Sequence, residues 1–182
     1  LEQAGALLVA VRVAGHDLVT LVFDDTQYPY SLVAFRKAVS LAIDRKTVWK
    51  LGEYGYEPPA DAIGLSGLFP QWVTDPAVKK LAKQMATYSP AGAKKLLTEA
   101  GYPDGFEVTM DCPNDRYVND AAICQAVVGM LARIGVKVTL LAQPKAQYFA
   151  KVLKPGGYQT SFFLLGWTPG TFDSHNVLYD IM

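Results

Sequence analysis

The sequence has little of the chemistry that metal centres and nucleophilic enzymes use. It contains two cysteines and two histidines among 182 residues. These four side chains, Cys112, Cys124, His16 and His175, do not show the spacing of metal ligands. No Gly-x-Ser-x-Gly motif marks a serine nucleophile. The sequence therefore predicts no metal site and no cofactor.

An excess of charge of one sign is also lacking. Seventeen basic and seventeen acidic side chains cancel, so no net field attracts the chain to nucleic acid or to an anionic membrane surface. No apolar run approaches the roughly 18 residues that a transmembrane helix needs. The longest runs, 6–11 and 161–167, have the length of strands. With 51% hydrophobic residues, the chain nevertheless has ample material for a core.

Signals of a natural start and stop are missing as well. The sequence starts at Leu1 without an initiator methionine or a basic segment typical of signal peptides. It stops at Met182 inside an expected helix. We expect residues 1–182 to be a single α/β unit that belongs to a longer protein. Residues 52–75 are rich in Gly and Pro and are expected to form an irregular connection within it.

Residues 89–110 carry the clearest local pattern. Ser89 can cap a helix whose first position is Pro90, and Gly101 can end that helix in a left-handed conformation. After a Pro-Asp-Gly turn, apolar and polar residues alternate along 106–110, as in a strand with one buried face. The helix has a single apolar stripe, formed by Ala93, Leu96, Leu97 and Ala100.

Comparable patterns predict the other elements of the first half. We expect a strand at 17–23, a second strand with a weaker pattern at 9–13, and a helix that begins at Ser31. Asp44 is placed to cap a second, short helix that ends at Leu51. The apolar stripe of the first of these helices is Leu32, Phe35, Val39, Ala42 and Ile43.

In the second half, strands and helices alternate. Asn119 is expected to cap the helix after the first strand, and Gly135 is expected to end it. The alternation predicts an α/β fold with a largely parallel or mixed sheet flanked by helices. The expected order is strand 106–112, helix 119–134, strand 136–141, short helix 146–153, strand 160–165 and a final helix.

Four segments carry a resemblance to a known family. They are FRKAVSLAIDR at 35–45, the unit 89–110, LARIGVKV at 131–138, and GWT at 166–168. In this order they resemble the extracytoplasmic solute-binding proteins of peptide ABC transporters, the peptide/nickel-binding family 5. The resemblance implies one lobe of a two-lobed periplasmic binding protein fold (type II, cluster C-like). It also implies a periplasmic or extracytoplasmic location and no catalysis.

The resemblance also implies partners. They are a small ligand (an oligopeptide or another carboxylate-bearing solute), the missing lobe of the same chain, and the membrane permease of an ABC importer. No nucleic acid is expected. A chemoreceptor or signalling protein would use the same cleft and remains an alternative function. A hydrolytic enzyme is a further alternative, because Asp173 and His175 could form a dyad, although no nucleophile motif accompanies them.

Two loops are expected at the ligand-binding edge of the sheet. In open α/β sheets, ligands bind beyond the carboxyl ends of the strands. Segments 112–120 and 166–176 each follow an expected strand and are dense in polar and aromatic residues. If the two strands are parallel, both loops lie at the same edge.

Arg116 is the first candidate for ligand contact. A guanidinium can bind a carboxylate through two hydrogen bonds. The resemblance places Arg116 where dipeptide-binding members of the family hold the C-terminal carboxylate of the ligand. The alternatives are a solvated arginine or an ion pair with Asp115 or Asp120. Asn114 is a candidate for polar contact with the ligand, and Tyr117 is a candidate for stacking.

The second loop contributes further candidates but departs from the family pattern. Trp167 and Phe172 could stack on a ligand, although Trp167 could equally pack against the sheet, and Thr168 is a polar neighbour. Gly170 stands where peptide binders carry the Asp that pairs with the α-amino group of the ligand. Asp173 matches a second acidic position of the motif. We therefore expect a ligand with an acidic group but no free amine at that point.

Cys112 and Cys124 allow two interpretations. They are either two buried thiols or a disulfide between the end of the strand 106–112 and the first turns of the following helix. The exported location that the resemblance implies favours the disulfide. A bond that closes a loop of this size contributes about 3 kcal/mol in the chain-entropy model.

Overall fold

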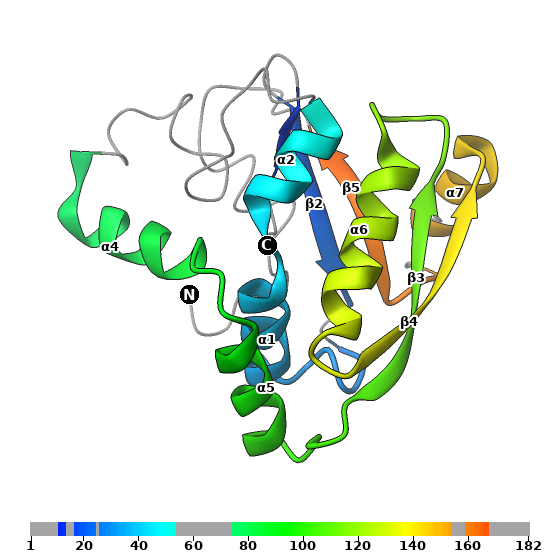
Figure 1. The fold of residues 1–182 in the computed structure, drawn as a ribbon. Coiled ribbons are helices and arrows are strands. Elements are labelled where there is room, and N and C mark those ends of the chain that lie inside the picture. Colours follow the sequence, from blue (N-terminus) through cyan, green and yellow to red (C-terminus); the bar gives the residue numbers. More distant parts are fainter. Residues whose placement is uncertain (1–10, 14–16, 25, 54–73, 154–158, 168–182) are drawn as a thin grey trace.

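The computed structural model describes residues 11–13, 17–24, 26–53, 74–153 and 159–167 (Figure 1). A mixed five-stranded sheet in the order β1-β2-β5-β3-β4 forms its centre. β3 is parallel to β4 and to β5, whereas β2 is antiparallel to β5 and β1 is antiparallel to β2. This confirms the predicted α/β fold with a mixed sheet. The strands are β1 (Val11–Val13), β2 (Asp17–Phe23), β3 (Phe106–Pro113), β4 (Val136–Gln143) and β5 (Phe162–Trp167).

Helices flank both faces of this sheet. One face carries α1, α5 and α6, and the other carries α7 (Figure 1). The helix α4 extends away from the sheet and has no counterpart among the expected elements. None of the helices in the described ranges has the length and apolarity to cross a membrane. The helices are α1 (Val33–Ala42), α2 (Arg45–Glu53), α4 (Pro76–Met85), α5 (Pro90–Glu99), α6 (Asp120–Ala132) and α7 (Lys145–Val152).

Local capping explains where several helices begin. The Ser89 hydroxyl accepts a hydrogen bond from Gly92 N at 3.2 Å, and Pro90 follows at the first helical position of α5. The Asp44 carboxylate accepts hydrogen bonds from Lys46 N and Thr47 N at the start of α2. Both caps confirm the sequence-based predictions. The expected final helix and most of the connection 52–75 lie outside the described residues.

The predicted cap of α6 was wrong. Asn119 precedes α6 but adopts a left-handed conformation (φ 52°), and its side chain makes no capping hydrogen bond. Its amide instead donates to Leu51 O, at 2.8 Å. Asparagine tolerates this backbone region better than most residues because its short polar side chain can bond locally. The helix therefore needs another group to satisfy its first N–H donors.

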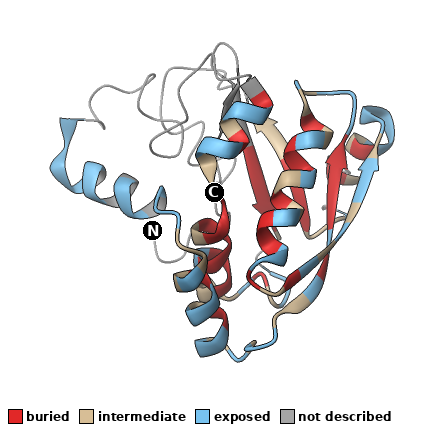
Figure 2. Cartoon of the chain, in the orientation of Figure 1, coloured by how far each residue is buried: buried red, intermediate tan, exposed pale blue. Residues whose placement is uncertain are grey.

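The main core lies between the sheet and the α1, α5 and α6 layer (Figure 2). On β3, Val108, Met110 and Cys112 are buried on this side, while Glu107 and Thr109 on the opposite face are exposed. A smaller cluster under α7 contains Val22, Tyr148, Val152 and Phe163.

A close approach of two glycines brings the starts of β3 and β4 together. Gly105 and Gly135 both have positive φ (75° and 90°). A Cβ atom on Gly105 would lie 1.9 Å from Gly135 O. Only glycine at 105 lets the two turns meet in this way, and Phe106 then pairs with Val136 in the parallel register of β3 and β4.

Candidate functional site

The carboxyl ends of β3 and β5 lie at the same edge of the sheet. The two strands are parallel, with Asp111 opposite Phe163. We call residues 114–119, the segment that leaves β3, the β3 loop. It contacts the end of β5 directly, because Gly166 N donates to the Tyr117 hydroxyl at 2.8 Å. The segment that leaves β5, from residue 168 onward, lies outside the described residues.

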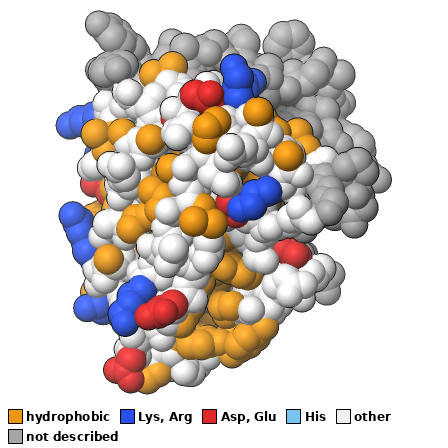
Figure 3. Space-filling model, turned by 90° about the vertical axis from the view of Figure 1, so that its right-hand side faces the viewer, with side chains coloured by type: hydrophobic (Ala, Val, Ile, Leu, Met, Phe, Trp, Pro, Cys, Tyr) orange, Lys and Arg blue, Asp and Glu red, His pale blue; other side chains and the backbone are white. Residues whose placement is uncertain are grey.

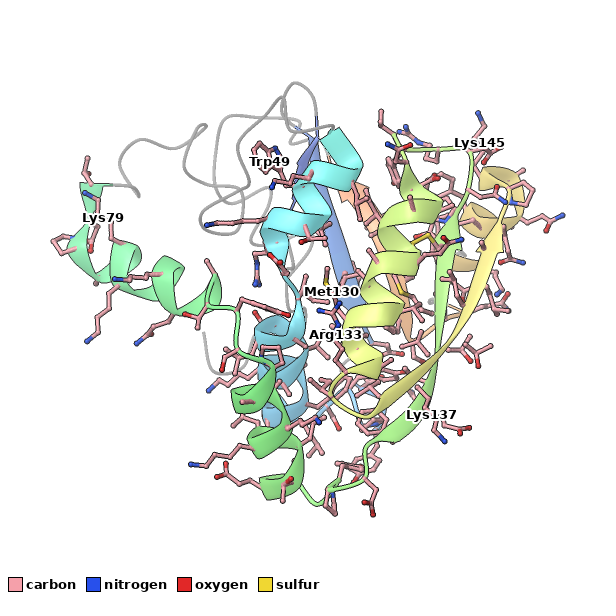
Figure 4. All side chains as sticks on the ribbon, viewed as in Figure 1. Trp49, Lys79, Met130, Arg133, Lys137 and Lys145 are labelled. Atoms are coloured by element: carbon pink, nitrogen blue, oxygen red, sulfur yellow. A yellow bond between two sulfur atoms is a disulfide. The ribbon has the colours of Figure 1, made fainter. Side chains whose placement is uncertain are left out.

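Backbone and side-chain hydrogen bonds fix the first half of the β3 loop to β4 and α7. Asn114 N donates to Gln143 O at 3.0 Å. The Asp115 carboxylate accepts a 2.6 Å hydrogen bond from the backbone N of Lys145, the first residue of α7. Figure 4 shows Lys145 at this end of the molecule. The loop is thus tied to the neighbouring strand and to a helix N-terminus.

The second half of the loop is organised around Asp120, the first residue of α6. One carboxylate oxygen, Oδ2, accepts hydrogen bonds from Arg116 N (2.9 Å) and Tyr117 N (3.0 Å). The other oxygen, Oδ1, accepts from Ala121 N at 2.8 Å. Asp120 is only 3% exposed. Its negative charge at the helix N-terminus is favourable because the helix dipole is positive there.

Arg116 is exposed in this otherwise fixed loop. Its guanidinium carbon lies 4.9 Å from the centre of the Tyr117 ring, a cation–π distance. No ion pair joins the guanidinium to another residue in the described part of the chain. The two carboxylates that the sequence offered as partners, Asp115 and Asp120, accept backbone N–H groups instead. Arg116 therefore presents its positive charge at the edge of the sheet.

Tyr117 has a packing role in the structure. Its ring is partly buried against the core, and its hydroxyl accepts the Gly166 N–H. The ring lies so close to β5 that a Cβ atom on Gly166 would be 2.4 Å from Tyr117 Cε1. Tyr117 therefore connects the β3 loop to β5. Its predicted stacking on a ligand stays a prediction.

Cys112 and Cys124 form a disulfide. It joins the end of β3 to α6, and both residues are fully buried. The bridge spans 12 positions of sequence, which include the whole β3 loop. The loop therefore begins and ends on two elements that are covalently connected.

The profile of the bacterial extracellular solute-binding proteins, family 5 (middle region), matches residues 1–182. The chain belongs to this family. The glutathione-binding protein GsiB of Salmonella typhimurium is 32% identical over 148 residues, which are 80% of this chain and 27% of that protein. GsiB of Escherichia coli is 30% identical over 148 residues, which again cover 80% of this chain and 27% of that protein. The chain thus spans about a quarter of the length of these relatives.

Solved structures of other ligand-binding proteins share the fold. A dipeptide-binding protein of Pseudoalteromonas in complex with Met-Leu has a TM-score of 0.72 and 25% identity, and the match covers 88% of this chain and 30% of that one. The protein AgaA of A. tumefaciens in complex with agropinic acid has a TM-score of 0.75 and 25% identity, over 89% and 31% of the two chains. The fold is that of periplasmic binding proteins, as the resemblance implied.

The other predicted site residues are placed only in part. In this family 5 chain, Asn114 is exposed in the β3 loop. Trp167 is the last residue of β5, and its backbone pairs with that of Leu18 on β2. The remaining candidates of the second loop, Thr168, Gly170, Phe172, Asp173 and His175, lie outside the described residues, as does His16. The structure therefore brings together the β3 loop and the end of β5.

A separate hollow of about 520 Å³ lies on the α7 face of the sheet. Lys151 Nζ and Asp111 Oδ1 form an ion pair there at 2.6 Å, and the Asp111 side chain is only 4% exposed. Figure 3 shows this side of the molecule, where charged side chains are scattered among hydrophobic and other side chains. Asp111 satisfies the lysine, so the pair holds α7 on the sheet. Among the described residues, no group of three metal-ligating side chains occurs.

Proposed function

We propose that this chain forms one lobe, and one wall of the ligand site, of a substrate-binding protein that serves an ABC importer. The protein binds a small carboxylate-bearing solute, such as a short peptide, in the periplasm. Closure of the second lobe, supplied by the rest of the protein, encloses the ligand and presents it to a membrane permease. The protein binds and releases its ligand without chemical change.

The observation that carries this proposal is the exposed guanidinium of Arg116. It lies at the carboxyl edge of the sheet, where ligands of open α/β folds bind. It has no carboxylate partner among the described residues. A guanidinium without a carboxylate partner among the described residues is suited to a bidentate hydrogen bond with a ligand carboxylate. Arg116 is therefore the proposed anion clamp.

The named ligands of the relatives support a peptide. GsiB is named for glutathione, and the dipeptide-binding protein was solved with Met-Leu. Both molecules are short peptides with a free C-terminal carboxylate. The resemblance adds a second property, because Gly170 stands at the position where peptide binders carry the Asp that pairs with the ligand amine. We infer that the amine of the ligand contributes little to binding at that point.

The test uses the full-length protein, purified without denaturation. Native mass spectrometry first reports whether a ligand is retained, and isothermal titration with Met-Leu and with reduced glutathione then gives the affinities. Replacing Arg116 with alanine should weaken binding of the carboxylate ligand about 10- to 100-fold, because hydrogen bonds to charged groups contribute about 1.5–3 kcal/mol. N-acetyl-Met-Leu should bind about as tightly as Met-Leu.

Arg133→Ala is the matched control. Arg133 is exposed, and Figure 4 shows it at the end of α6 far from the β3 loop. Its replacement should leave the affinity unchanged. Unchanged affinity in Arg116→Ala would remove the anion clamp from the proposal. A large loss on N-acetylation would contradict the inference drawn from Gly170.

A further inference from the structure

The backbone on either side of the clamp is held by one buried carboxylate. The N–H groups of Arg116 and Tyr117 both point to Asp120 Oδ2, at 2.9 and 3.0 Å. Asp120 is 3% exposed, and its other oxygen accepts Ala121 N. Three backbone donors thus converge on one side chain. Hydrogen bonds from backbone N–H groups to a carboxylate are stronger than those between neutral groups.

This arrangement keeps the carboxylate away from the guanidinium. Asp120 is four residues from Arg116, and an ion pair between them would neutralise the clamp. Both oxygens of Asp120 are instead occupied by N–H groups, and its charge lies at the N-terminus of α6. The helix dipole compensates the buried charge. Asp120 therefore leaves the positive charge of Arg116 available to a ligand.

The side chain of Arg116 is guided by a second fixed group. Its guanidinium lies 4.9 Å from the centre of the Tyr117 ring, and Gly166 N holds the hydroxyl of that ring at 2.8 Å. The side chain thus starts from a fixed backbone and ends beside a fixed ring. Binding to such a group costs less conformational entropy than ordering a free arginine.

We propose that Asp120 is a positioning residue for the anion clamp: it holds the backbone of Arg116 and Tyr117 so that the guanidinium meets the ligand carboxylate in one geometry. This inference rests on the proposed function of Arg116. In this proposal, Asp120 raises the affinity for the ligand carboxylate only by positioning Arg116. A residue with only a structural role would affect all ligands and all backgrounds alike.

The first measurement is amide hydrogen exchange of the full-length protein without ligand. In the native protein, the N–H groups of Arg116 and Tyr117 should be protected although they lie in a loop. Asp120→Asn keeps the shape of the side chain but removes its charge and one acceptor, so exchange at both positions should rise about tenfold or more. Asp115→Asn is the matched control, because the Asp115 carboxylate holds Lys145 N and not the backbone at 116. Unchanged exchange in Asp120→Asn would overturn the proposal.

The second measurement is a double-mutant cycle on affinity. Titration uses Met-Leu or reduced glutathione, whichever binds, together with its C-terminal amide. Asp120→Asn should weaken the carboxylate ligand about tenfold and the amide hardly at all. In the Arg116→Ala background, the same change should have no further effect on either ligand.

The outcomes separate the two proposals. Binding of neither peptide contradicts the proposed peptide ligand, and an Arg116→Ala variant with full affinity removes the anion clamp; either result overturns the positioning role as well. A weakened Arg116→Ala variant combined with an additive loss from Asp120→Asn keeps the clamp but overturns the positioning role. A weakened Arg116→Ala variant supports both proposals when Asp120→Asn weakens binding in the native background and has no further effect in the Arg116→Ala background, and an Asp120→Asn change without effect in either background overturns the positioning role.

Discussion

Replacing Gly166 with alanine tests the contact that joins the β3 loop to β5. The new Cβ atom would lie 2.4 Å from Cε1 and 2.7 Å from Cζ of Tyr117. Carbon atoms in contact are about 3.5–4.0 Å apart, so the tyrosine ring must move by roughly 1 Å or more. That movement also breaks the hydrogen bond from Gly166 N to the Tyr117 hydroxyl.

The expected loss of stability follows from these two effects. Inserting a methyl group into a packed site costs about 1–3 kcal/mol, and the lost hydrogen bond costs about 1 kcal/mol. We therefore expect Gly166→Ala to lower the free energy of unfolding by about 2–4 kcal/mol, measured by urea denaturation of the full-length protein. Because the ring guides Arg116, affinity for a carboxylate ligand should fall as well.

Two variants make the test specific. In a Tyr117→Ala background the clash disappears, so Gly166→Ala should then cost less than about 1 kcal/mol. A Cβ atom added to Gly129, inside α6, would meet nothing within 4 Å beyond the backbone of its own helix, and Gly129→Ala should stabilise the helix by about 0.5–1 kcal/mol. A Gly166→Ala variant as stable as the native protein would refute the reasoning, as would an unchanged cost in the Tyr117→Ala background.

Three further predictions concern the sheet and its α7 face. Gly105→Ala should lower the free energy of unfolding by more than about 4 kcal/mol, because its Cβ would meet a backbone oxygen at 1.9 Å. Gly101 also has a positive φ but has open space around it, so Gly101→Ala should cost only about 1 kcal/mol. Urea denaturation of both variants checks the difference. Lys151→Met should cost about 2–3 kcal/mol because it leaves buried Asp111 unpaired, and adding Asp111→Asn should recover most of this loss. Burial raises the pKa of the Tyr148 hydroxyl in the folded protein above its ordinary value of 10.0. Above pH 10 the tyrosine therefore ionises in the unfolded chain first, and the stability that the buried neutral hydroxyl contributes below pH 10 is lost as the pH rises. Urea midpoints from pH 8 to 11 should therefore fall less steeply in Tyr148→Phe, and equal slopes would contradict this.

The elements whose ends depend on local chemistry could be predicted from the sequence. Ser89 and Asp44 begin their helices because their side-chain oxygens accept the first N–H groups, which needs no tertiary contact. The alternation of apolar and polar residues along 106–110 likewise predicted the strand β3. The antiparallel pairing of β2 with β5 could not be predicted, because strand order depends on packing between distant segments.

The candidate site was predictable only at the level of the loop. The direction of β3 placed the loop at the carboxyl edge of the sheet, and a resemblance drew attention to Arg116. The role of Asp120 was missed because the sequence shows an acid near an arginine and suggests an ion pair. Which donor a carboxylate meets depends on backbone geometry that the sequence does not display. An acidic residue one position after the expected cap was the available signal.

The two helices beside the β3 loop determine which of its charges are offset. By composition, the segment from Asp115 to Asp120 carries two acidic residues and one basic residue, so its net negative charge would attract cations. In the structure, Asp115 accepts the first N–H of α7, and Asp120 lies at the start of α6. Each helix N-terminus supplies roughly half a positive charge that offsets its carboxylate. The charge of Arg116 is offset by neither helix, so a loop that is acidic by composition presents a cation at the edge where a ligand carboxylate would bind.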